Sequence, residues 1–438
     1  MLVLKFGGTS VGSVARIKEV AELINDGQQK IVVLSAMAGT TNALVEIAEY
    51  FYKENTDAAV ERIINLENKY YSVVDELFET DKYKQEGKGL IKNHFDFIRS
   101  FTRDMFTLHE EKEILAQGEF ISTALMQYYL EEQGVKSNLL SALKFMRIDK
   151  AGEPDEFYIK ENLTRELDAF GDFNIVITQG FICRNAYGMI DNLQRGGSDY
   201  SASIIGAALN ADEIQIWTDI DGVHTNDPRV VENTHAIPEL SFDEAAELAY
   251  FGAKILHPTC ILPAKVTNIP VRIKNTLEPQ ADGTLITSTT AKERVKAIAA
   301  KDGITAIKIK SGRMLMAHGF LRKVFEIFET YQTPIDMITT SEVGVSVTID
   351  DDSKLNDIVE DLRKYGTVDV EKNHVIICVV GDLIAENKGI AAAVFNAVKE
   401  IPLRMISYGG SNHNISMLVK QEYKKQALVA LSENLFDN

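Results

Sequence analysis

Short apolar segments alternate with helical patterns through the first part of the chain, and this alternation constrains the fold more than any other feature. Residues 2–4 lead into the segment KFGGTS at positions 5–10, and residues 11–26 then have the apolar spacing of a helix. A second apolar run at 31–34 ends in the segment SAMAGTTN at 35–42. Strands that are apolar throughout are buried on both faces, so the pattern predicts a parallel sheet covered by helices. Ligands bind at the carboxyl ends of such strands, where these polar segments fall.

Later segments extend this prediction. Apolar runs at 174–182 and 213–217 continue the pattern, whereas residues 50–113 have the spacing of long amphipathic helices. We interpret residues 50–113 as a helical insertion without a catalytic role. Another helix is predicted to begin at Ser241, because Ser241 and Glu244 match a capping box, and we expect Lys254 at its far end.

The last part of the chain contains an internal repeat. The segment PIDMI at 334–338 recurs as PLRMI at 402–406, 68 residues later. Each copy follows a helical pattern that begins at a glycine, and each precedes an alternating strand, at 343–349 and 415–419. The repeat predicts two related modules after a larger N-terminal domain.

The composition excludes several classes of partner. The chain has 46 Lys and Arg against 64 Asp and Glu, a formal net charge of −18, which argues against nucleic acids and anionic membranes. The cysteines Cys183, Cys260 and Cys378 lack the spacing of a metal site, and we expect them to be buried, reduced thiols. No apolar run is long enough to span a bilayer, and the N-terminus does not resemble a signal peptide. These features predict a cytoplasmic globular protein.

The segment at 5–10 is the first candidate for chemistry. Backbone amides of Gly7 and Gly8 can approach an anion there, and Lys5 adds one positive charge. The segment is not a Walker A motif, because Ser13 and Val14 replace the required Lys and Ser or Thr. An ordinary glycine turn between strand and helix remains an alternative.

Two further segments are candidate ligand sites. In RGGSD at 195–199, Arg195 beside two glycines can hold a carboxylate or phosphate, and Asp199 can hold an ammonium or metal-bound water. The alternative is a helix cap with a solvated arginine. The segment TDIDGVH at 218–224 lacks the pattern of a calcium loop. It is either a nucleotide-contacting loop or an acidic turn, and His224 either stacks on a base or lies on the surface.

Taken together, these motifs resemble the aspartate kinases of the amino-acid kinase family over essentially the whole chain. The matching segments, in order, are KFGGTS (5–10), SAMAGTTN (35–42), GE before a helix (Gly118 and Glu119), RGGSD (195–199), TDIDGVHTNDPR (218–229) and FGAKILHP (251–258). The repeat is similar to the paired ACT domains of these enzymes, with ITTSE at 338–342 and SNHN at 411–414.

The resemblance implies an amino-acid kinase fold, a parallel-type sheet between helices, followed by two ferredoxin-like (βαββαβ) ACT domains. It places the kinase domain at 1–290 and the ACT domains at 303–370 and 371–438, with a strand from about 303–312 completing the second. The implied reaction is phosphorylation of the side-chain carboxylate of L-aspartate by ATP, giving 4-phospho-L-aspartate at the start of lysine, threonine and methionine biosynthesis.

The chemistry of this reaction agrees with the residues available. An aspartate carboxylate has a pKa near 4 and is ionised at neutral pH, so the reaction needs no general base. Catalysis then consists of holding two anions together and balancing the charge of the transferred group. We choose Lys5 with Gly7 and Gly8 as the phosphoryl cradle and Lys254 as a second charge. Mg²⁺ is expected to bridge the phosphates without a dedicated protein site.

The family pattern also assigns binding residues. In this pattern, Arg195 binds a substrate carboxylate and Glu119 binds the α-ammonium group of the substrate. Nearby substrate contacts are assigned to Thr41, Ser198 and the catalytic candidate Asp199. Predicted nucleotide contacts are Lys5, Gly7, Gly8, Ser10, Thr218, Asp219, His224, Arg229 and Lys254. His224 stands where the family commonly has tyrosine, which leaves its contact with adenine open.

An end-product amino acid is the expected regulator. The effector residues implied by the similarity to lysine-sensitive aspartate kinases are Met314, Ala317, Gly319, Phe320, Leu321, Ile335, Asp336 and Ser341. Lysine is the preferred effector and threonine an alternative, because Met316 and Ala317 replace more polar residues common in the family. In the family this site lies between the ACT domains of two subunits, which implies a homodimer or homotetramer.

Two other functions compete with this interpretation. One is a related kinase that acts on glutamate or an acetylated amino acid, against which the ACT pair and RGGSD argue. The other is an amino-acid sensor that has lost phosphoryl transfer. The joint presence of Lys5, Arg195, Asp219 and Lys254 argues against a sensor.

Overall fold

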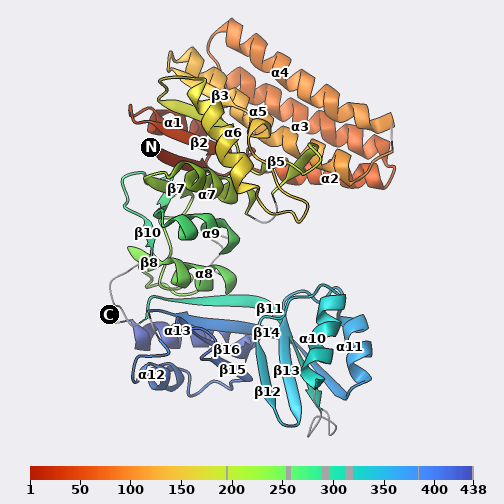
Figure 1. The fold of residues 1–438 in the computed structure, drawn as a ribbon, viewed down its shortest axis with the longest axis vertical. Coiled ribbons are helices and arrows are strands. Elements are labelled where there is room, and N and C mark those ends of the chain that lie inside the picture. Colours follow the sequence, from red (N-terminus) through yellow and green to blue (C-terminus); the bar gives the residue numbers. More distant parts are fainter. Residues whose placement is uncertain are drawn as a thin grey trace. The chain divides into compact units, whose positions relative to one another are not determined.

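The computed structural model divides the chain into two compact units (Figure 1). The first comprises Met1–Val223 and Leu256–Thr289, and the second comprises His224–Ile255 and Thr290–Asn438. The structure describes residues 1–103, 105–193, 196–252, 258–288, 295–310, 319–382 and 384–436. The boundary predicted at residue 290 coincides with this division, but residues 224–255, which the prediction placed in the first domain, belong to the second unit.

A mainly parallel sheet forms the centre of the first unit. Its strands are β1 (Leu2–Phe6), β2 (Lys30–Leu34), β3 (Ser137–Leu140), β4 (Ile175–Gln179), β7 (Glu213–Thr218), β9 (Val271–Asn275) and β10 (Thr284–Thr287). They lie in the order β3-β4-β2-β1-β7-β9-β10. All adjacent pairs are parallel except β9 and β10. Every residue of β2 and β4 is buried, which explains their continuous apolar sequences.

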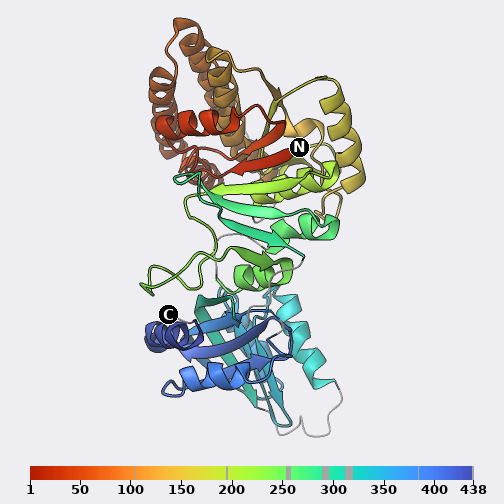
Figure 2. The ribbon, with the colours of Figure 1, turned by 90° about the vertical axis from the view of Figure 1, so that its left-hand side faces the viewer.

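Helices cover both faces of this sheet (Figure 2). They are α1 (Val14–Ile24), α2 (Thr40–Tyr52), α3 (Thr56–Leu77), α4 (Asp81–Ser100), α5 (Leu108–Glu132), α6 (Glu156–Asp168), α7 (Gly197–Leu209) and α9 (Pro258–Thr267). Short 3₁₀ helices span Phe101–Arg103 and Ala142–Lys144, and β5 (Ile182–Arg184) pairs with β6 (Ile190–Asn192). Gly118 and Glu119, expected before a helix, lie inside α5 instead.

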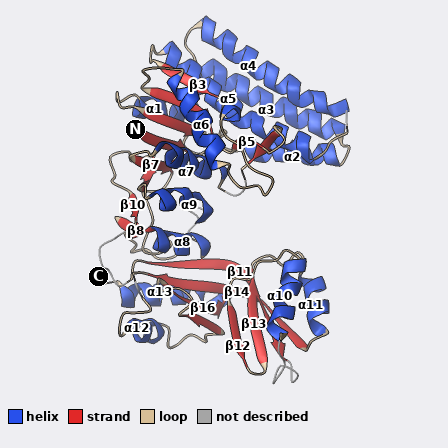
Figure 3. Cartoon of the chain, viewed as in Figure 1, coloured by secondary structure: helices blue, strands red, loops and turns tan. Residues whose placement is uncertain are grey.

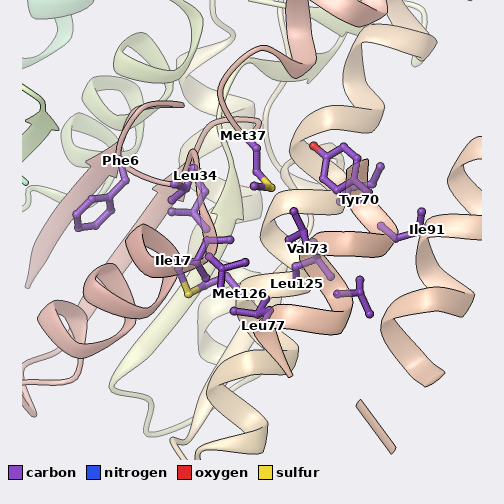
Figure 4. Packing of buried hydrophobic residues seen from close by; sticks show 14 of the residues in the cluster. Phe6, Ile17, Leu34, Met37, Tyr70, Val73, Leu77, Ile91, Leu125 and Met126 are labelled. Atoms are coloured by element: carbon purple, nitrogen blue, oxygen red, sulfur yellow. The ribbon is translucent and has the colours of Figure 1, made fainter. Parts of the chain in front are cut away.

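The predicted helical insertion is part of the main core. Helices α3 and α4 fall within residues 50–113, and their buried side chains join one hydrophobic cluster with residues of β1, β2 and α5. Figure 4 shows Tyr70, Val73 and Ile91 from these helices with Phe6 and Leu34 from the strands. The insertion is therefore an integral part of the first unit, because the apolar faces of its helices contribute to the same hydrophobic core as the sheet.

The second unit is built on an antiparallel sheet (Figure 3). Its strands are β11 (Ala297–Lys310), β12 (Ile338–Ser341), β13 (Gly344–Ile349), β14 (Thr367–Val380), β15 (Met405–Tyr408) and β16 (Asn414–Lys420), in the order β12-β13-β11-β14-β16-β15. The helices are α10 (Phe320–Thr330), α11 (Leu355–Arg363), α12 (Ile390–Ala397) and α13 (Lys424–Leu435), with a 3₁₀ turn at Gln421–Tyr423. Strand β8 (Glu239–Ser241) and α8 (Phe242–Tyr250) also belong to this unit.

Two βαββαβ modules share the long strands β11 and β14. The first runs from residues 304–310 of β11 through α10, β12, β13 and α11 to the first part of β14. The second runs from the last part of β14 through α12, β15, β16 and α13, and its remaining strand is residues 297–301 of β11. The completing strand therefore precedes the predicted segment 303–312. Because residues 297–301 come before the first module in sequence, the first module is inserted into the second.

The internal repeat corresponds to this pair of modules. Helices α10 and α12 both follow a glycine in a left-handed conformation, Gly319 and Gly389. The PIDMI and PLRMI segments lead into the equivalent strands β12 and β15. The repeated sequence signals, a glycine before a helix and a similar segment before a strand, therefore correspond to two copies of the same structural module.

Residues 224–252 are held on the second sheet by several side chains. Asn226 Nδ2 donates to the Leu428 carbonyl (3.1 Å), and Asn414 Nδ2 donates to Glu247 Oε2 (2.5 Å). The predicted capping box of Ser241 and Glu244 is present in α8. Helix α8 ends at Tyr250, before the predicted position of Lys254, and residues 253–257 lie outside the described ranges.

Two expectations about the chain as a whole can be compared with the structure. Cys183, Cys260 and Cys378 are free and buried, as predicted. Among the described residues, no helix has both the length and the apolar character needed to cross a membrane.

The packing of Gly252 gives a test of this arrangement. A Cβ atom on Gly252 (φ +111°) would lie 2.3 Å from the Ala300 carbonyl oxygen of β11, whereas Gly389 (φ +87°) has open space. Gly252→Ala should therefore lower the Tm more than Gly389→Ala. The expected difference is several degrees, because an overpacked contact costs about 1–3 kcal/mol and 1 kcal/mol shifts the Tm of a unit this size by about 2–4 °C. Equal shifts in calorimetry would contradict the packing of this segment on the sheet.

Candidate active site

The predicted site residues that the structure describes in the first unit lie at or near the carboxyl edge of its sheet. Strand order reverses at β1, with β2, β4 and β3 on one side and β7, β9 and β10 on the other. In open parallel sheets, ligands bind outside the carboxyl ends of the strands at such a reversal. The segments that follow β1, β2 and β7 therefore border the expected site.

Glycines allow three segments of this edge to approach closely. A Cβ on Gly8 would lie 2.9 Å from the Ala36 carbonyl oxygen, and one on Gly180 would lie 2.5 Å from the Ser198 Cβ. A Cβ on Gly118 would lie 2.8 Å from the Ala36 Cβ. A side chain at Gly8 or Gly118 would clash with the segment after β2, and one at Gly180 would clash with the start of α7. These close contacts therefore require glycine.

Lys5 and Asp199 form an ion pair at this edge. Lys5 Nζ lies 2.6 Å from Asp199 Oδ1, and the two side chains are 12% and 18% exposed. Lys5 alternates with the buried Leu4 and Phe6 along β1, while Asp199 lies in the first turn of α7, where an acidic side chain is favoured. The structure thus brings two predicted catalytic residues together, and both retain some access to solvent.

Two helices present amide groups near these residues. The N-cap residues of α2 and α7 are Gly39 and Gly196, both with positive φ. Since glycine has no side chain that could cap a helix, its use leaves first-turn N–H groups available to an anion. The predicted substrate residues Thr41 and Ser198 are the second residues of these two helices. Among the described residues, the site therefore offers Lys5 and two helix N-termini to anionic ligands.

Glu119 lies beneath the segment that follows β2. Its Oε1 accepts a hydrogen bond from the Ala36 N–H (3.1 Å), and its side chain is almost fully buried. Within the described part of the chain, Glu119 Oε2 has no hydrogen-bond partner. Burial raises the pKa of Glu119 to about 8. The carboxyl group is therefore largely protonated at neutral pH until a cation comes close to it.

The predicted nucleotide residues of the first unit have different surroundings. Ser10 is buried, and its Oγ lies 2.7 Å from Thr276 Oγ1. Thr218 ends β7, and its carbonyl accepts hydrogen bonds from the Thr276 N–H (2.8 Å) and Oγ1 (2.6 Å). Asp219 is exposed and accepts from Thr218 Oγ1 (3.1 Å). Asp219 remains accessible to a nucleotide or its metal ion.

The remaining candidates lie in the second unit or outside the described residues. His224 and Arg229 belong to the second unit, where His224 Nδ1 lies 3.0 Å from Thr234 Oγ1. Arg229 is exposed and pairs with Asp227 through two hydrogen bonds of 2.9 and 2.8 Å. Arg195 and Lys254 lie outside the described residues.

The predicted effector residues that the structure describes lie in the first βαββαβ module. The side chain of Asp336 is buried, and its Oδ1 lies 2.6 Å from Lys301 Nζ. Phe320 is buried in the module core, with Ile335 partly buried against it. Leu321 is exposed, Gly319 is the N-cap of α10, and Ser341 ends β12. Met314 and Ala317 are outside the described ranges.

Sequence reasoning did not find the residues that hold the segment after β2. Lys69 and Tyr70 of α3 form hydrogen bonds to Ala38 and Thr40. Tyr70 occupies an apolar position in the helical spacing of α3, so its sequence signal is that of an ordinary core residue.

The sequence predicts no dedicated metal site formed by protein residues. In the ranges that the structure describes, no group of three or more His, Cys, Asp and Glu side chains is arranged to hold a metal ion. Isolated carboxylates such as Asp219 fit the way Mg²⁺ is usually bound beside nucleotide phosphates, with one or two protein oxygens.

Comparisons with known families agree with the two units. Residues 1–275 match the Amino acid kinase family, and residues 377–435 match the ACT domain. The second match covers the end of β14, α12, β15, β16 and α13 of the second βαββαβ module. The predicted fold class, an amino-acid kinase fold followed by ferredoxin-like ACT modules, is confirmed.

Characterised relatives are similar over the full length. Lysine-sensitive aspartokinase 3 of Escherichia coli (strain K12) is 34% identical over 450 residues, which cover 100% of this chain and 99% of that protein. Aspartokinase 1, chloroplastic, of Arabidopsis thaliana is 35% identical over 463 residues, covering 100% and 80%. The crystal structure of E. coli aspartokinase III with aspartate and ADP (R-state) has a TM-score of 0.85 at 33% identity, covering 100% of both chains. This chain belongs to the aspartokinases.

Glu119 gives a pH-dependent prediction. Its pKa is raised on folding from about 4.5 to about 8, so the unfolded chain releases this proton first, and stability falls as pH rises through that interval. Glu119→Gln removes the titration. The Tm of the variant relative to the unaltered protein should therefore increase between pH 5.5 and pH 7.5, with each pH unit corresponding to at most about 1.4 kcal/mol. A difference in Tm that is independent of pH would contradict the shifted pKa.

Proposed function

We propose that this chain transfers the γ-phosphoryl group of ATP to the side-chain carboxylate of L-aspartate, giving 4-phospho-L-aspartate and ADP. The observation that carries the proposal is the Lys5–Asp199 ion pair of 2.6 Å at the carboxyl edge of the sheet. Two helices with glycine N-caps begin beside the segments that border this pair. Its aspartokinase relatives supply the substrate class, since E. coli aspartokinase III has been crystallised with aspartate and ADP.

The reaction requires little proton transfer. An oxygen of the aspartate side chain, already ionised at neutral pH, attacks the γ-phosphorus. The bond from this phosphorus to the β–γ bridging oxygen breaks, and its electron pair leaves with ADP. The enzyme must therefore bring two anions together and balance negative charge on the transferred group. Lys5 and the amides of Gly7 and Gly8 are suited to this task.

Glu119 is suited to the α-ammonium group of aspartate. Its buried Oε2 lacks a hydrogen-bond partner among the described residues, and an ammonium group would both satisfy this oxygen and stabilise the ionised carboxylate. Thr41, Ser198 and Asp199 lie in the first turns of α2 and α7, which are suited to the carboxylates of the same substrate. We assign Arg195 to a substrate carboxylate on the family pattern alone.

For the nucleotide, we propose ATP with Mg²⁺. Asp219 is exposed at the end of β7 and can contribute an oxygen to a metal ion held mainly by phosphates. When bound, Mg²⁺ supplies charge neutralisation for the phosphoryl group. His224, Arg229 and Lys254 keep their proposed nucleotide roles from the family pattern.

We also propose a place for the reaction in metabolism and in the cell. The product is an acyl phosphate, which must be consumed by a subsequent step, and the family pattern places it at the start of lysine, threonine and methionine biosynthesis. The three free, buried cysteines are consistent with a cytoplasmic location.

Feedback inhibition is proposed for the second unit, with lysine as the first candidate and threonine as the alternative. E. coli aspartokinase III has been crystallised with lysine and aspartate in a T-state, at a TM-score of 0.83 and 34% identity, covering 100% of both chains. Asp336 is a buried carboxylate in the first module, and its Oδ2 has no hydrogen-bond partner among the described residues. A homodimer or homotetramer formed through the ACT modules would bring two such sites together.

Replacement of Lys5 tests the catalytic proposal. Lys5→Ala should reduce aspartyl hydroxamate formation by at least about 10²-fold, the effect of removing one group that stabilises transition-state charge. Lys160→Ala, an exposed position on α6, is the matched control and should retain full activity. Circular dichroism should show that both variants are folded. Turnover of Lys5→Ala at the rate of the unaltered enzyme would overturn the role.

A substrate and effector panel tests the rest of the proposal. ADP release should depend on L-aspartate and be negligible with glutamate or N-acetylglutamate, and millimolar lysine should lower the initial rate. Threonine is measured alone and with lysine. If neither amino acid changed the rate, the regulatory proposal would be wrong while the aspartate result would stand.

A further inference from the structure

We propose that Tyr70, a residue of the helical insertion, is a positioning residue for the aspartate site, acting through Thr40. This inference rests on the proposed function, because it assigns a role in aspartate binding to a residue that does not itself border the carboxyl edge of the sheet. Tyr70 lies in α3, and Thr40 is the first residue of α2, directly before the proposed substrate residue Thr41.

The contact between Tyr70 and Thr40 is specific and buried. Tyr70 OH lies 2.8 Å from Thr40 Oγ1, and the two residues are 0% and 1% exposed. The ring of Tyr70 packs in the main core (Figure 4), and its centroid is 6.1 Å from that of the Phe95 ring. A phenylalanine would provide the same apolar packing. The buried hydroxyl therefore needs another explanation, and its partner in the structure is the start of α2.

The hydroxyl group of Tyr70 also keeps its proton. Burial raises the pKa of Tyr70 above its ordinary value, so the group remains protonated at every pH at which the enzyme is expected to work. It can therefore hold Thr40 in the same way whether the nearby Glu119 is ionised or protonated.

Two other side chains hold the same segment. Lys69 Nζ, on the adjacent residue of α3, donates to the Ala38 carbonyl (3.0 Å), and the Ala38 N–H donates to the Gly8 carbonyl (3.0 Å). Glu119 accepts from the Ala36 N–H. Residues 36–40 are thus fixed by α3 and α5 and in turn contact the proposed phosphoryl cradle. Tyr70 is the member of this set that acts at the start of α2.

A consequence for kinetics follows from the position of Thr40. The first turn of α2 carries Thr41, which we assign to aspartate, whereas ATP contacts are assigned to other segments. Loss of the Tyr70–Thr40 hydrogen bond should therefore weaken the binding of aspartate more than the binding of ATP.

The test compares two adjacent tyrosines of α3. Tyr70→Phe should raise the KM for aspartate by about 3- to 10-fold, the range expected for one buried hydrogen bond, and leave the KM for ATP nearly unchanged. Tyr71→Phe is the matched control, because Tyr71 OH donates to Glu67 Oε1 (3.2 Å) on the same helix and not to the segment 36–40. It should behave as the unaltered enzyme.

Variants of Thr40 complete the experiment. Thr40→Ser keeps the hydroxyl and should retain the normal KM for aspartate, whereas Thr40→Val should raise it. The double variant Thr40→Val with Tyr70→Phe should be no worse than either single variant, because both remove the same bond.

Each outcome decides between interpretations. If Tyr70→Phe matched Tyr71→Phe, or lowered only kcat with both KM values unchanged, Tyr70 would serve stability alone and the proposal would be overturned. If the unaltered protein had no aspartate-dependent activity, the proposed function itself would fail, which the same assay shows before any variant is compared.

Discussion

The site depends on the close approach of polypeptide segments at the carboxyl edge of the first sheet. Lys5 on β1 meets Asp199 on α7 only because Gly180 lets the start of α7 lie against the segment after β4. Gly8 and Gly118 likewise allow the segments after β1 and β2 to pack on each other and on α5. The positive charge, the two helix N-termini and the buried Glu119 are therefore consequences of backbone contacts that a methyl group would prevent.

The second unit contains residues that we propose for regulation and residues that we propose for nucleotide binding. Residues 224–252 pack on the sheet shared by the two βαββαβ modules, and Tyr250, at the end of α8, donates a hydrogen bond to Asp336 (3.3 Å). Lys301 pairs with Asp336 and with Asp350 (2.8 Å). The proposed effector carboxylate is thus one hydrogen bond from the helix that precedes Lys254. A change at Asp336 has a direct contact through which it can reach that helix.

Much of this architecture could be predicted from the sequence because its signals are local. Uninterrupted apolar runs indicate buried parallel strands, and the repeated PIDMI and PLRMI segments indicate duplicated modules. The capping box at Ser241 defined the start of α8. The start of one helix was placed wrongly: α5 begins after Thr107 with a capping box, so Gly118 and Glu119 lie inside it. Other features depend on distant contacts, such as the buried contact of Ser10 with Thr276 across 266 positions of sequence.

The family, the order of the elements and the residues proposed to neutralise two anionic substrates could be predicted from the chain alone, because motifs and periodicity are local properties of the sequence. Three features became visible only in the packed structure: the compact unit that contains residues 224–252, the part of β11 that completes the second module, and the hydrogen-bond partner of Tyr70. Each of these depends on which side chains meet across the fold. A helical pattern shows that residue 70 is buried, but only the packed structure shows that its oxygen meets Thr40.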